Sequence, residues 1–248
     1  MRQFGTEAAW RKIGTMIRAE RFGYRVTHHM SAFFGPSPIK LTSTDEPVEG
    51  PVLIAFDFDG TLTTKDSFMA FLQWRAGPLG FAAGLVRLIP DACNYLVHRD
   101  RALIKAAAVK VFLKGVSRRN LEVDARHFAE HIGPTLFRSD ALATWRRWRA
   151  KGARPVIVTA SPDIIVAPFA RSLGADTLIG TRLAFDDNDC VTGELLTPNC
   201  RGPEKVRRLR EVFGDEVVLA AAYGDTAGDK EMLTLADERG YRVFTAKA

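Results

Sequence analysis

Three short apolar runs constrain this chain most, because each one stops at a cluster of polar residues. The runs cover residues 52–56, 155–158 and 217–222. Each is continuous rather than alternating, as expected of strands that are buried on both faces of a parallel sheet. Helical patterns lie at 141–151, 163–173, 203–213 and 229–239, and a short strand is expected at 241–244. This alternation predicts an α/β fold with a doubly wound, parallel, Rossmann-like sheet.

Two inserts interrupt the predicted sheet. Residues 62–138 contain helical stretches but no clear strand, which predicts a helical cap inserted after the first strand. Residues 181–197 carry Asp, Asn and Gly between short apolar groups, which predicts a β-hairpin flap. We therefore expect an N-terminal extension and linker at 1–50, a catalytic core at 51–61 and 139–248, and a cap at 62–138.

Composition is that of an ordinary globular protein, with 46% hydrophobic and 26% charged residues. The three cysteines lack the short paired spacing of a disulfide framework or a zinc site. The uncharged apolar stretch at 76–86 is well short of the ~20 residues that span a bilayer. We expect a cytoplasmic protein. Residues 8–25 could form a basic amphipathic helix that gives peripheral contact with an anionic inner membrane, whereas a poorly ordered tail is the favoured interpretation of this segment.

The first polar cluster, Asp57-Phe58-Asp59-Gly60-Thr61, lies at the end of the first predicted strand. Carboxyl ends of the strands are where open α/β sheets build their sites. Two carboxylates in alternate positions can serve one phosphorus atom, with Asp57 as nucleophile and Asp59 as general acid and base. Asp57 would form an aspartyl-phosphate, and Thr61 would help to hold the loop and is a candidate contact of the phosphate.

A metal ion is expected beside these carboxylates, because they would otherwise repel a phosphate dianion. The third polar cluster contains Asp225 at a strand end and Asp229 one turn later. Mg²⁺ binds oxygen ligands in octahedral geometry and keeps several waters. We predict that Asp57, Asp225 and the backbone carbonyl of Asp59 provide its protein ligands, with Asp229 either as a further ligand or as a residue that holds one of them.

The second polar cluster and one lysine supply the expected anion contacts. The Thr159 hydroxyl and the N–H groups that begin the next helix can hold phosphate oxygens, with Ser161 as a further donor. Lys205 falls in the first turn of the helix at 203–213. It is the predicted cation that stabilises charge on the transferring phosphoryl group.

The order D-x-D-G-T, strand-terminal threonine, lysine and G-D-x-x-x-D resembles the haloacid dehalogenase superfamily over residues 52–245. The resemblance implies the roles of nucleophile for Asp57, general acid and base for Asp59, phosphate contacts for Thr159 and Lys205, and magnesium binding for Asp225 and Asp229. The dehalogenating branch lacks the second carboxylate. Asp59 therefore favours a phosphatase.

A cap inserted directly after the first motif is similar to the subfamily of phosphoserine phosphatases and a bacterial lipid phosphatase, phosphatidylglycerophosphatase C. Asp66, a predicted substrate contact, stands where phosphoserine phosphatases carry a glutamate that meets the substrate amine. Gly228 stands where they carry Asn. The patterns at 66–68, 159–162 and 200–206 are similar to those of the lipid enzyme.

The predicted cap is basic and apolar. Residues 62–138 hold twelve Lys or Arg against six Asp or Glu, and the first half is rich in apolar side chains. Such a surface suits an anionic amphiphile, although the same residues could pack the cap onto the core and leave the cations solvated. The leading hypothesis is a Mg²⁺-dependent phosphomonoester hydrolase that acts on a lipid phosphate such as phosphatidylglycerophosphate.

Two alternatives stay open. One is a soluble small-molecule phosphatase of the phosphoserine phosphatase type, and the other is a non-catalytic, membrane-peripheral regulatory binder. The complete catalytic set disfavours the binder. No nucleic-acid partner is expected, because Trp145 and Trp148 are neighbours three residues apart on a predicted helix and read as one buried face.

Overall fold

The computed structural model describes residues 52–90 and 101–247. A five-stranded sheet in the order β3-β2-β1-β6-β7 forms its centre. The strands are β1 (Leu53–Phe56), β2 (Arg154–Pro162), β3 (Thr177–Thr181), β6 (Leu219–Gly224) and β7 (Ala236–Tyr241). All of their pairings are parallel, so the predicted α/β fold is confirmed.

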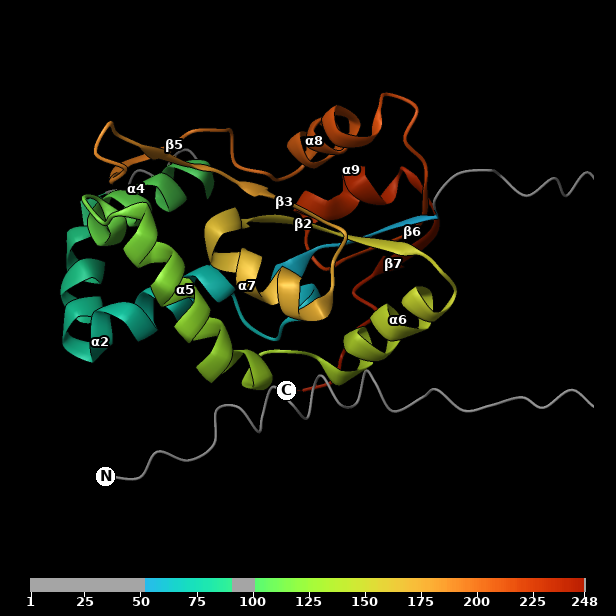
Figure 1. Cartoon of the computed structure of the whole chain (residues 1–248), viewed down its shortest axis with the longest axis horizontal. Helices are drawn as coiled ribbons and strands as arrows, with labels where there is room; N and C mark the ends of the chain where they lie inside the picture. Colours follow the sequence, from blue (N-terminus) through green and yellow to red (C-terminus); the bar gives the residue numbers. More distant parts are fainter. Residues whose placement is uncertain (1–51, 91–100, 248) are drawn as a thin grey trace, which may run out of the picture. The chain divides into compact units, whose positions relative to one another are not determined.

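Helices cover both faces of this sheet. Figure 1 shows α8 (Pro203–Phe213) and α9 (Lys230–Leu233) on one face, and α6 (Ser139–Ala150) and α7 (Asp163–Leu173) on the other. Ile54 and Phe56 of β1 join one apolar core, whereas Leu53 and Ala55 join a second core. Successive strand side chains point to opposite faces, which explains why a doubly covered strand reads as a continuous apolar run.

The predicted bounds of α7 and α8 are confirmed because local signals define both helices. Pro203 begins α8 at a position where its missing N–H costs nothing, and Gly214 follows the helix with a φ of +95°. At the end of α7, Gly174 adopts a left-handed conformation with a φ of +64°. Glycine takes this conformation without the steric penalty that a Cβ brings.

The insert after β1 is helical, as predicted. It consists of α2 (Ser67–Arg87), α4 (Arg101–Leu113), α5 (Arg118–Ile132) and the short turn η2 (Gly133–Thr135). Aromatic rings join this insert to the core, since Phe128 of α5 lies 5.8 Å from Phe169 of α7 between ring centroids. The domain boundaries at residues 50, 61 and 138 stay predictions.

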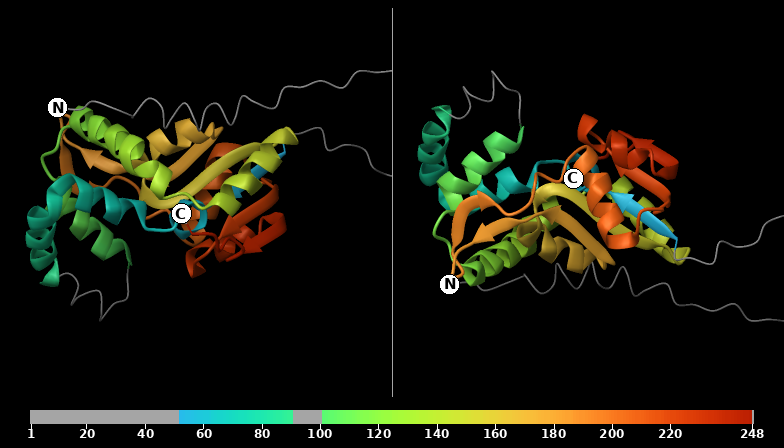
Figure 2. Two further views of the ribbon diagram at one scale, coloured as in Figure 1. Left: turned by 90° about the horizontal axis from the view of Figure 1, so that it is seen from below. Right: turned by 90° about the horizontal axis from the view of Figure 1, so that it is seen from above.

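The predicted hairpin is confirmed as β4 (Leu183–Phe185) paired antiparallel with β5 (Val191–Leu195). It lies beside α4 and α5 in both views of Figure 2. Backbone bonds join it to the loop between these helices, from Gly115 N to Val191 O at 2.8 Å and from Val191 N to Val116 O at 2.9 Å. Arg118 adds an ion pair of 2.7 Å with Asp189. The two inserts therefore contact each other directly.

The C-terminal prediction was wrong. A helix was expected at 229–239 and a strand at 241–244, but only α9 is helical and β7 begins at Ala236. Because backbone groups along β6 need partners, pairing with β7 outweighs the helical preference of this charged segment. Exposed Asp237, Glu238 and Arg239 suit an edge strand. Strand β3, which is short and half buried, was not predicted either.

Within residues 52–90 and 101–247, no helix is both long enough and apolar enough to cross a membrane. The amphipathic helix predicted at 8–25 lies outside the described residues.

Candidate active site

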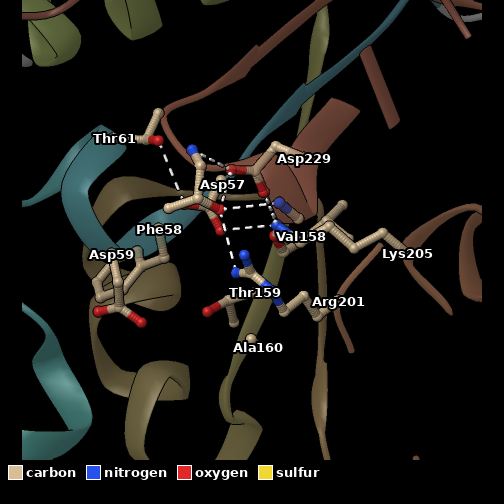
Figure 3. Close-up of polar contacts among 12 residues, drawn as sticks. Asp57, Phe58, Asp59, Thr61, Val158, Thr159, Ala160, Arg201, Lys205 and Asp229 are labelled. Atoms are coloured by element: carbon tan, nitrogen blue, oxygen red, sulfur yellow. Dashed lines mark hydrogen bonds and ion pairs between the residues drawn. The ribbon is translucent and has the colours of Figure 1, made fainter. Parts of the chain in front are cut away.

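Three of the side chains predicted to be functional lie together near the carboxyl ends of β1 and β6, namely Asp57, Lys205 and Asp229 (Figure 3). Asp57 follows β1 directly, and its backbone N–H donates to the Tyr223 carbonyl of β6 at 2.9 Å. Asp229 follows β6 inside a capping box with Thr226, and Lys205 enters from the first turn of α8. Three separate segments of the chain thus converge on one point.

Lys205 is the buried cation of this site. Its ammonium is 1% exposed and donates to Asp57 Oδ1 at 2.7 Å, Asp229 Oδ1 at 2.7 Å and the Val158 carbonyl at 2.6 Å. These three contacts use all three of its donors. Burial alone would lower the pKa of Lys205, but the carboxylates of Asp57 and Asp229 outweigh it and raise the pKa. The lysine is therefore a fixed positive charge beside Asp57.

Asp57 is buried and held from two sides. Lys205 contacts Oδ1, and the Thr61 hydroxyl donates to Oδ2 at 3.2 Å, as expected of a residue that holds the loop. Burial raises the pKa of Asp57 to about 7, with Asp229 adding to the rise and Lys205 opposing it. The two contacts thus fix the orientation of the carboxyl group. The charge of Lys205 only partly offsets the effects of burial and of Asp229 on its ionised form.

The carboxylate oxygens of Asp57, Asp225 and Asp229 can lie within 4.8 Å of one another. Among the described residues, Asp225 Oδ1 is buried and has no hydrogen-bond partner. Burial and the nearby Asp229 raise the pKa of Asp225. Three carboxylates here face the single ammonium of Lys205, so two negative charges remain uncompensated if all are ionised. A divalent cation with a preference for oxygen ligands fits this group, and Mg²⁺ is such an ion.

Asp229 is held in place by hydrogen bonds from Thr226. Its Oδ2 accepts from the backbone N–H of Thr226 at 2.8 Å and from the hydroxyl of the same residue at 2.9 Å. Although burial acts in the opposite direction, Lys205 and these hydrogen bonds lower the pKa of Asp229. The residue is therefore ionised and tightly held.

Asp59 stands apart from the acidic group in Figure 3. Its carboxylate accepts from the Ser67 N–H at 2.7 Å and from the Ser161 hydroxyl at 2.5 Å. Burial, followed by the charge of Asp66, raises the pKa of Asp59. The carboxyl therefore keeps a proton to a higher pH than an exposed aspartate. The metal contact expected from its backbone carbonyl stays a prediction.

A cavity of about 660 Å³ lies over these groups. The predicted catalytic and metal-binding side chains at its base are Asp57, Asp59, Lys205, Asp225 and Asp229. Its apolar wall comes from α2, from Leu88 and Ile89 just after α2, and from α4, and its other members are Phe68, Met69, Leu85, Ile104 and Ala108. The acidic group thus lies at the base, and apolar side chains form much of the wall.

The predicted phosphate contacts have other partners in the structure. Thr159 is fully buried, and its hydroxyl accepts from the Ser161 N–H at 3.0 Å. Neither Thr159 nor Ser161 is among the residues that line the cavity. Asp66 does line it, while its carboxylate caps α2 by accepting from the Met69 N–H at 2.8 Å. Direct contacts of these residues with a phosphate stay predictions.

Sequence reasoning missed three cations at the cavity, namely Lys65, Lys105 and Arg201. Arg201 lies in the pattern at residues 200–206, immediately before α8. Its guanidinium donates to the Thr226 hydroxyl at 3.1 Å. Lys65 and Lys105 come from the insert, where many basic residues occur. Only the packing of α2 and α4 selects which of them reach the cavity.

Gly60 fits closely beneath Asp225. Its φ is +83°, and a Cβ built there would lie 2.2 Å from Asp225 Oδ2. The glycine is therefore needed both for the backbone conformation and for the close approach of the loop to Asp225.

Relatives in sequence cover most of this chain. Protein CicA of Caulobacter vibrioides is 61% identical over 204 residues, which are 82% of this chain and 91% of that protein. "Probable phosphatase Rv3661" of Mycobacterium tuberculosis is 28% identical over 190 residues, 72% of this chain and 64% of that protein.

Solved structures share the fold at lower identity. A substrate-bound phosphoserine phosphatase has a TM-score of 0.54 and 19% identity, covering 78% of this chain and 86% of that chain. A Bordetella pertussis protein of unknown function has a TM-score of 0.63 and 23% identity, covering 74% and 86%. Residues 54–234, which include Asp57, Lys205 and Asp229, match the family described as haloacid dehalogenase-like hydrolase. The chain belongs to the haloacid dehalogenase-like hydrolases.

Proposed function

We propose that this hydrolase is a Mg²⁺-dependent phosphomonoesterase that acts on a lipid phosphate such as phosphatidylglycerophosphate. The observation that carries the proposal is the composition of the cavity. An uncompensated acidic group with one fixed ammonium forms the base, and apolar side chains of α2, of the residues just after it and of α4 form the wall. Asp57, Asp225 and Asp229 would hold the magnesium ion.

The first half-reaction transfers the phosphoryl group to Asp57. A carboxylate oxygen of Asp57 attacks phosphorus, the ester P–O bond breaks, and the leaving oxygen takes a proton from Asp59. Lys205 holds the attacking carboxylate in place through its 2.7 Å contact. When bound, Mg²⁺ supplies charge neutralisation at the phosphoryl oxygens.

The second half-reaction regenerates the enzyme. Asp59, now ionised, takes a proton from a water molecule whose oxygen attacks the phosphorus of the aspartyl-phosphate. The P–O bond to Asp57 breaks, which releases inorganic phosphate and restores both carboxyl groups. Hydrogen bonds from Ser67 and Ser161 keep Asp59 in one orientation through both steps.

The apolar wall supports a lipid as the substrate. Leu85 is 42% exposed and Ile89 is 56% exposed, and both also line the cavity. The apolar lining is therefore continuous with the surface, so that alkyl chains could leave the cavity while the phosphate stays at its base. Burial of apolar chain against such a wall is favourable by about 0.8 kcal/mol per CH₂.

A soluble aminophosphate is the second candidate. Asp66 lines the cavity, and a carboxylate in that position could pair with a substrate amine. The apolar wall gives no reason for such a substrate, so the lipid remains the leading proposal.

The chemistry is tested with p-nitrophenyl phosphate, which requires no lipid contact. We expect release of phosphate that EDTA abolishes and Mg²⁺ restores, and a phosphoryl group on the Asp57 peptide after acid quenching and mass spectrometry. Asp57→Asn should be inactive, whereas Asp187→Asn, an exposed aspartate in the hairpin turn, should keep full activity. Full activity in Asp57→Asn would exclude the mechanism.

The substrate is tested by comparing kcat/KM for phosphatidylglycerophosphate in mixed micelles with kcat/KM for phosphoserine. A preference for the lipid supports the proposal. A preference for phosphoserine would replace it with the soluble alternative.

A further inference from the structure

Lys105 is a basic residue that the chemistry above does not use. It projects from α4 of the insert and lines the cavity together with its apolar neighbours Ile104 and Ala108. Its ammonium donates to the carbonyl of Ala160, which lies in β2 between Thr159 and Ser161. A cation from the insert thus reaches across to the catalytic core.

The Lys105 ammonium and the Ala160 carbonyl do not depend on each other alone for hydrogen bonds. The Ala160 carbonyl already accepts from the Thr181 hydroxyl at 2.7 Å, so it keeps a partner if Lys105 moves away. An ammonium has three donors, and the contact with Ala160 uses one. Within the described residues, no carboxylate lies within 4.0 Å of the Lys105 ammonium.

We propose that Lys105 binds a second anionic group of the substrate, adjacent to the phosphate that is hydrolysed. This proposal rests on the phosphatase function and names a feature of its substrate. The nearest candidates for that group are a phosphodiester and a carboxylate, because each offers oxygen acceptors for the ammonium.

The position of Lys105 favours a group between the catalytic base and the apolar wall. Lys205 is held at the base by three acceptors, which use all of its donors. Lys65 is exposed, and Arg201 is bound to Thr226. Lys105 is half buried among apolar side chains, where an anion is poorly solvated and gains most from a cation.

An anionic ligand would act on the pKa of Lys105. Burial lowers its pKa, while the carboxylates of Asp59 and Asp66 oppose the shift. A ligand anion would add to the effect of these carboxylates and stabilise the ammonium further.

Two matched pairs of substrates test the proposal. Phosphatidylglycerophosphate and phosphatidic acid are both lipid phosphomonoesters, but only the first carries an additional phosphodiester. Phosphoserine and phosphoethanolamine differ only in the carboxylate. In one of the pairs, we expect wild type to have a higher kcat/KM for the member that carries a second anionic group besides the phosphomonoester. The pair that shows this preference identifies the second group as a phosphodiester or a carboxylate.

Substitution Lys105→Met should remove this preference. A hydrogen bond to a charged group contributes enough to make the expected fall in the kcat/KM ratio about 10- to 100-fold. The fall should come from the member with the second anion, and mainly through KM. Lys110→Met is the matched control, since Lys110 is exposed on the same helix and does not line the cavity. An equal loss on both members of each pair, or an unchanged ratio, overturns the proposal.

A binding measurement distinguishes failure of the Lys105 proposal from failure of the proposed phosphatase function. Dissociation constants for the same pairs are measured by calorimetry in Asp57→Asn, with and without Lys105→Met, so that turnover is not required. If wild type hydrolyses neither p-nitrophenyl phosphate nor any of the four compounds, the phosphatase function fails. The Lys105 proposal then stands only if Lys105→Met weakens binding of the compound with the second anion and not of its partner.

Discussion

Ser161 donates a 2.5 Å hydrogen bond to Asp59, so the end of β2 orients a carboxyl group that belongs to the loop after β1. The two residues are 102 positions apart in the chain. This serine was expected to contact phosphate, and its hydroxyl instead contacts the predicted general acid.

Replacement Ser161→Ala should impair proton donation to the leaving group. We expect kcat to fall about 10- to 100-fold for an alkyl phosphate, because a hydrogen bond to a charged group is lost. The fall should be smaller for p-nitrophenyl phosphate, whose leaving group needs little protonation. Steady-state kinetics on both substrates checks this, with Ser172→Ala as control, since that hydroxyl only bonds the Phe169 carbonyl in α7. Equal losses on the two substrates would refute the role given to Ser161.

Gly60→Ala should disrupt the metal group. Its Cβ would lie 2.2 Å from Asp225 Oδ2, and the left-handed backbone would cost a further 1–2 kcal/mol, roughly, of folding free energy. Gly77→Ala is the control for backbone strain, because its φ of +68° also disfavours alanine while no atom lies within 4 Å of the added carbon. Both variants should lose stability, but only Gly60→Ala should need about 10- to 100-fold more Mg²⁺ for half-maximal activity. The same Mg²⁺ requirement in both variants contradicts the prediction.

Lys205→Met should destabilise the fold as well as the chemistry. It leaves Asp57 and Asp229 buried without their ammonium partner, which typically costs about 3–5 kcal/mol. Urea unfolding in EDTA measures this cost. The double variant Lys205→Met with Asp229→Asn should be more stable than the single variant, because one unpaired charge is removed. Arg207→Met on the exposed side of α8 should have little effect, and a similarly small effect of Lys205→Met would argue against the pairing.

Asp140 should make the C-terminal segment sensitive to acid. Its carboxylate accepts from the N–H groups of Thr245 at 2.8 Å and Ala246 at 2.9 Å. Burial acts in the opposite direction, but these bonds lower the pKa of Asp140 below that of an unfolded aspartate. The stabilisation is therefore complete above a pH of about 4 and disappears as the pH falls through the lower folded pKa.

The measurement is the difference in unfolding free energy between wild type and Asp140→Asn at pH 7 and at pH 3. We expect wild type to be the more stable at pH 7 and the difference to shrink at pH 3. Asp237→Asn on the exposed edge strand serves as control. A difference that grows on acidification would show that the sign is wrong.

Local signals explain the parts of the fold that the sequence predicts well. Pro203 begins α8 and Gly174 ends α7, and each acts through its own backbone geometry. β7 depends instead on its neighbour β6, since its charged residues have no intrinsic preference for a strand. Tertiary pairing of this kind leaves no periodic pattern to detect.

The residues of the candidate site also differ in how well the sequence predicts their positions. Asp57, Lys205, Asp225 and Asp229 could be predicted to converge, because strand ends and a helix start place their backbones. The partners of Ser161 and Lys105 depend on side-chain directions and on how α4 packs over the core. Those are properties of the folded chain that spacing in the sequence does not encode.

The backbone bonds between Val191 of the hairpin and the loop at Gly115 and Val116 have a consequence for engineering. Exchange of the insert 62–138 alone between two relatives would leave β5 facing a foreign loop. A functional chimera should therefore carry residues 181–197 from the same donor, since specificity transferred with one segment depends on its companion.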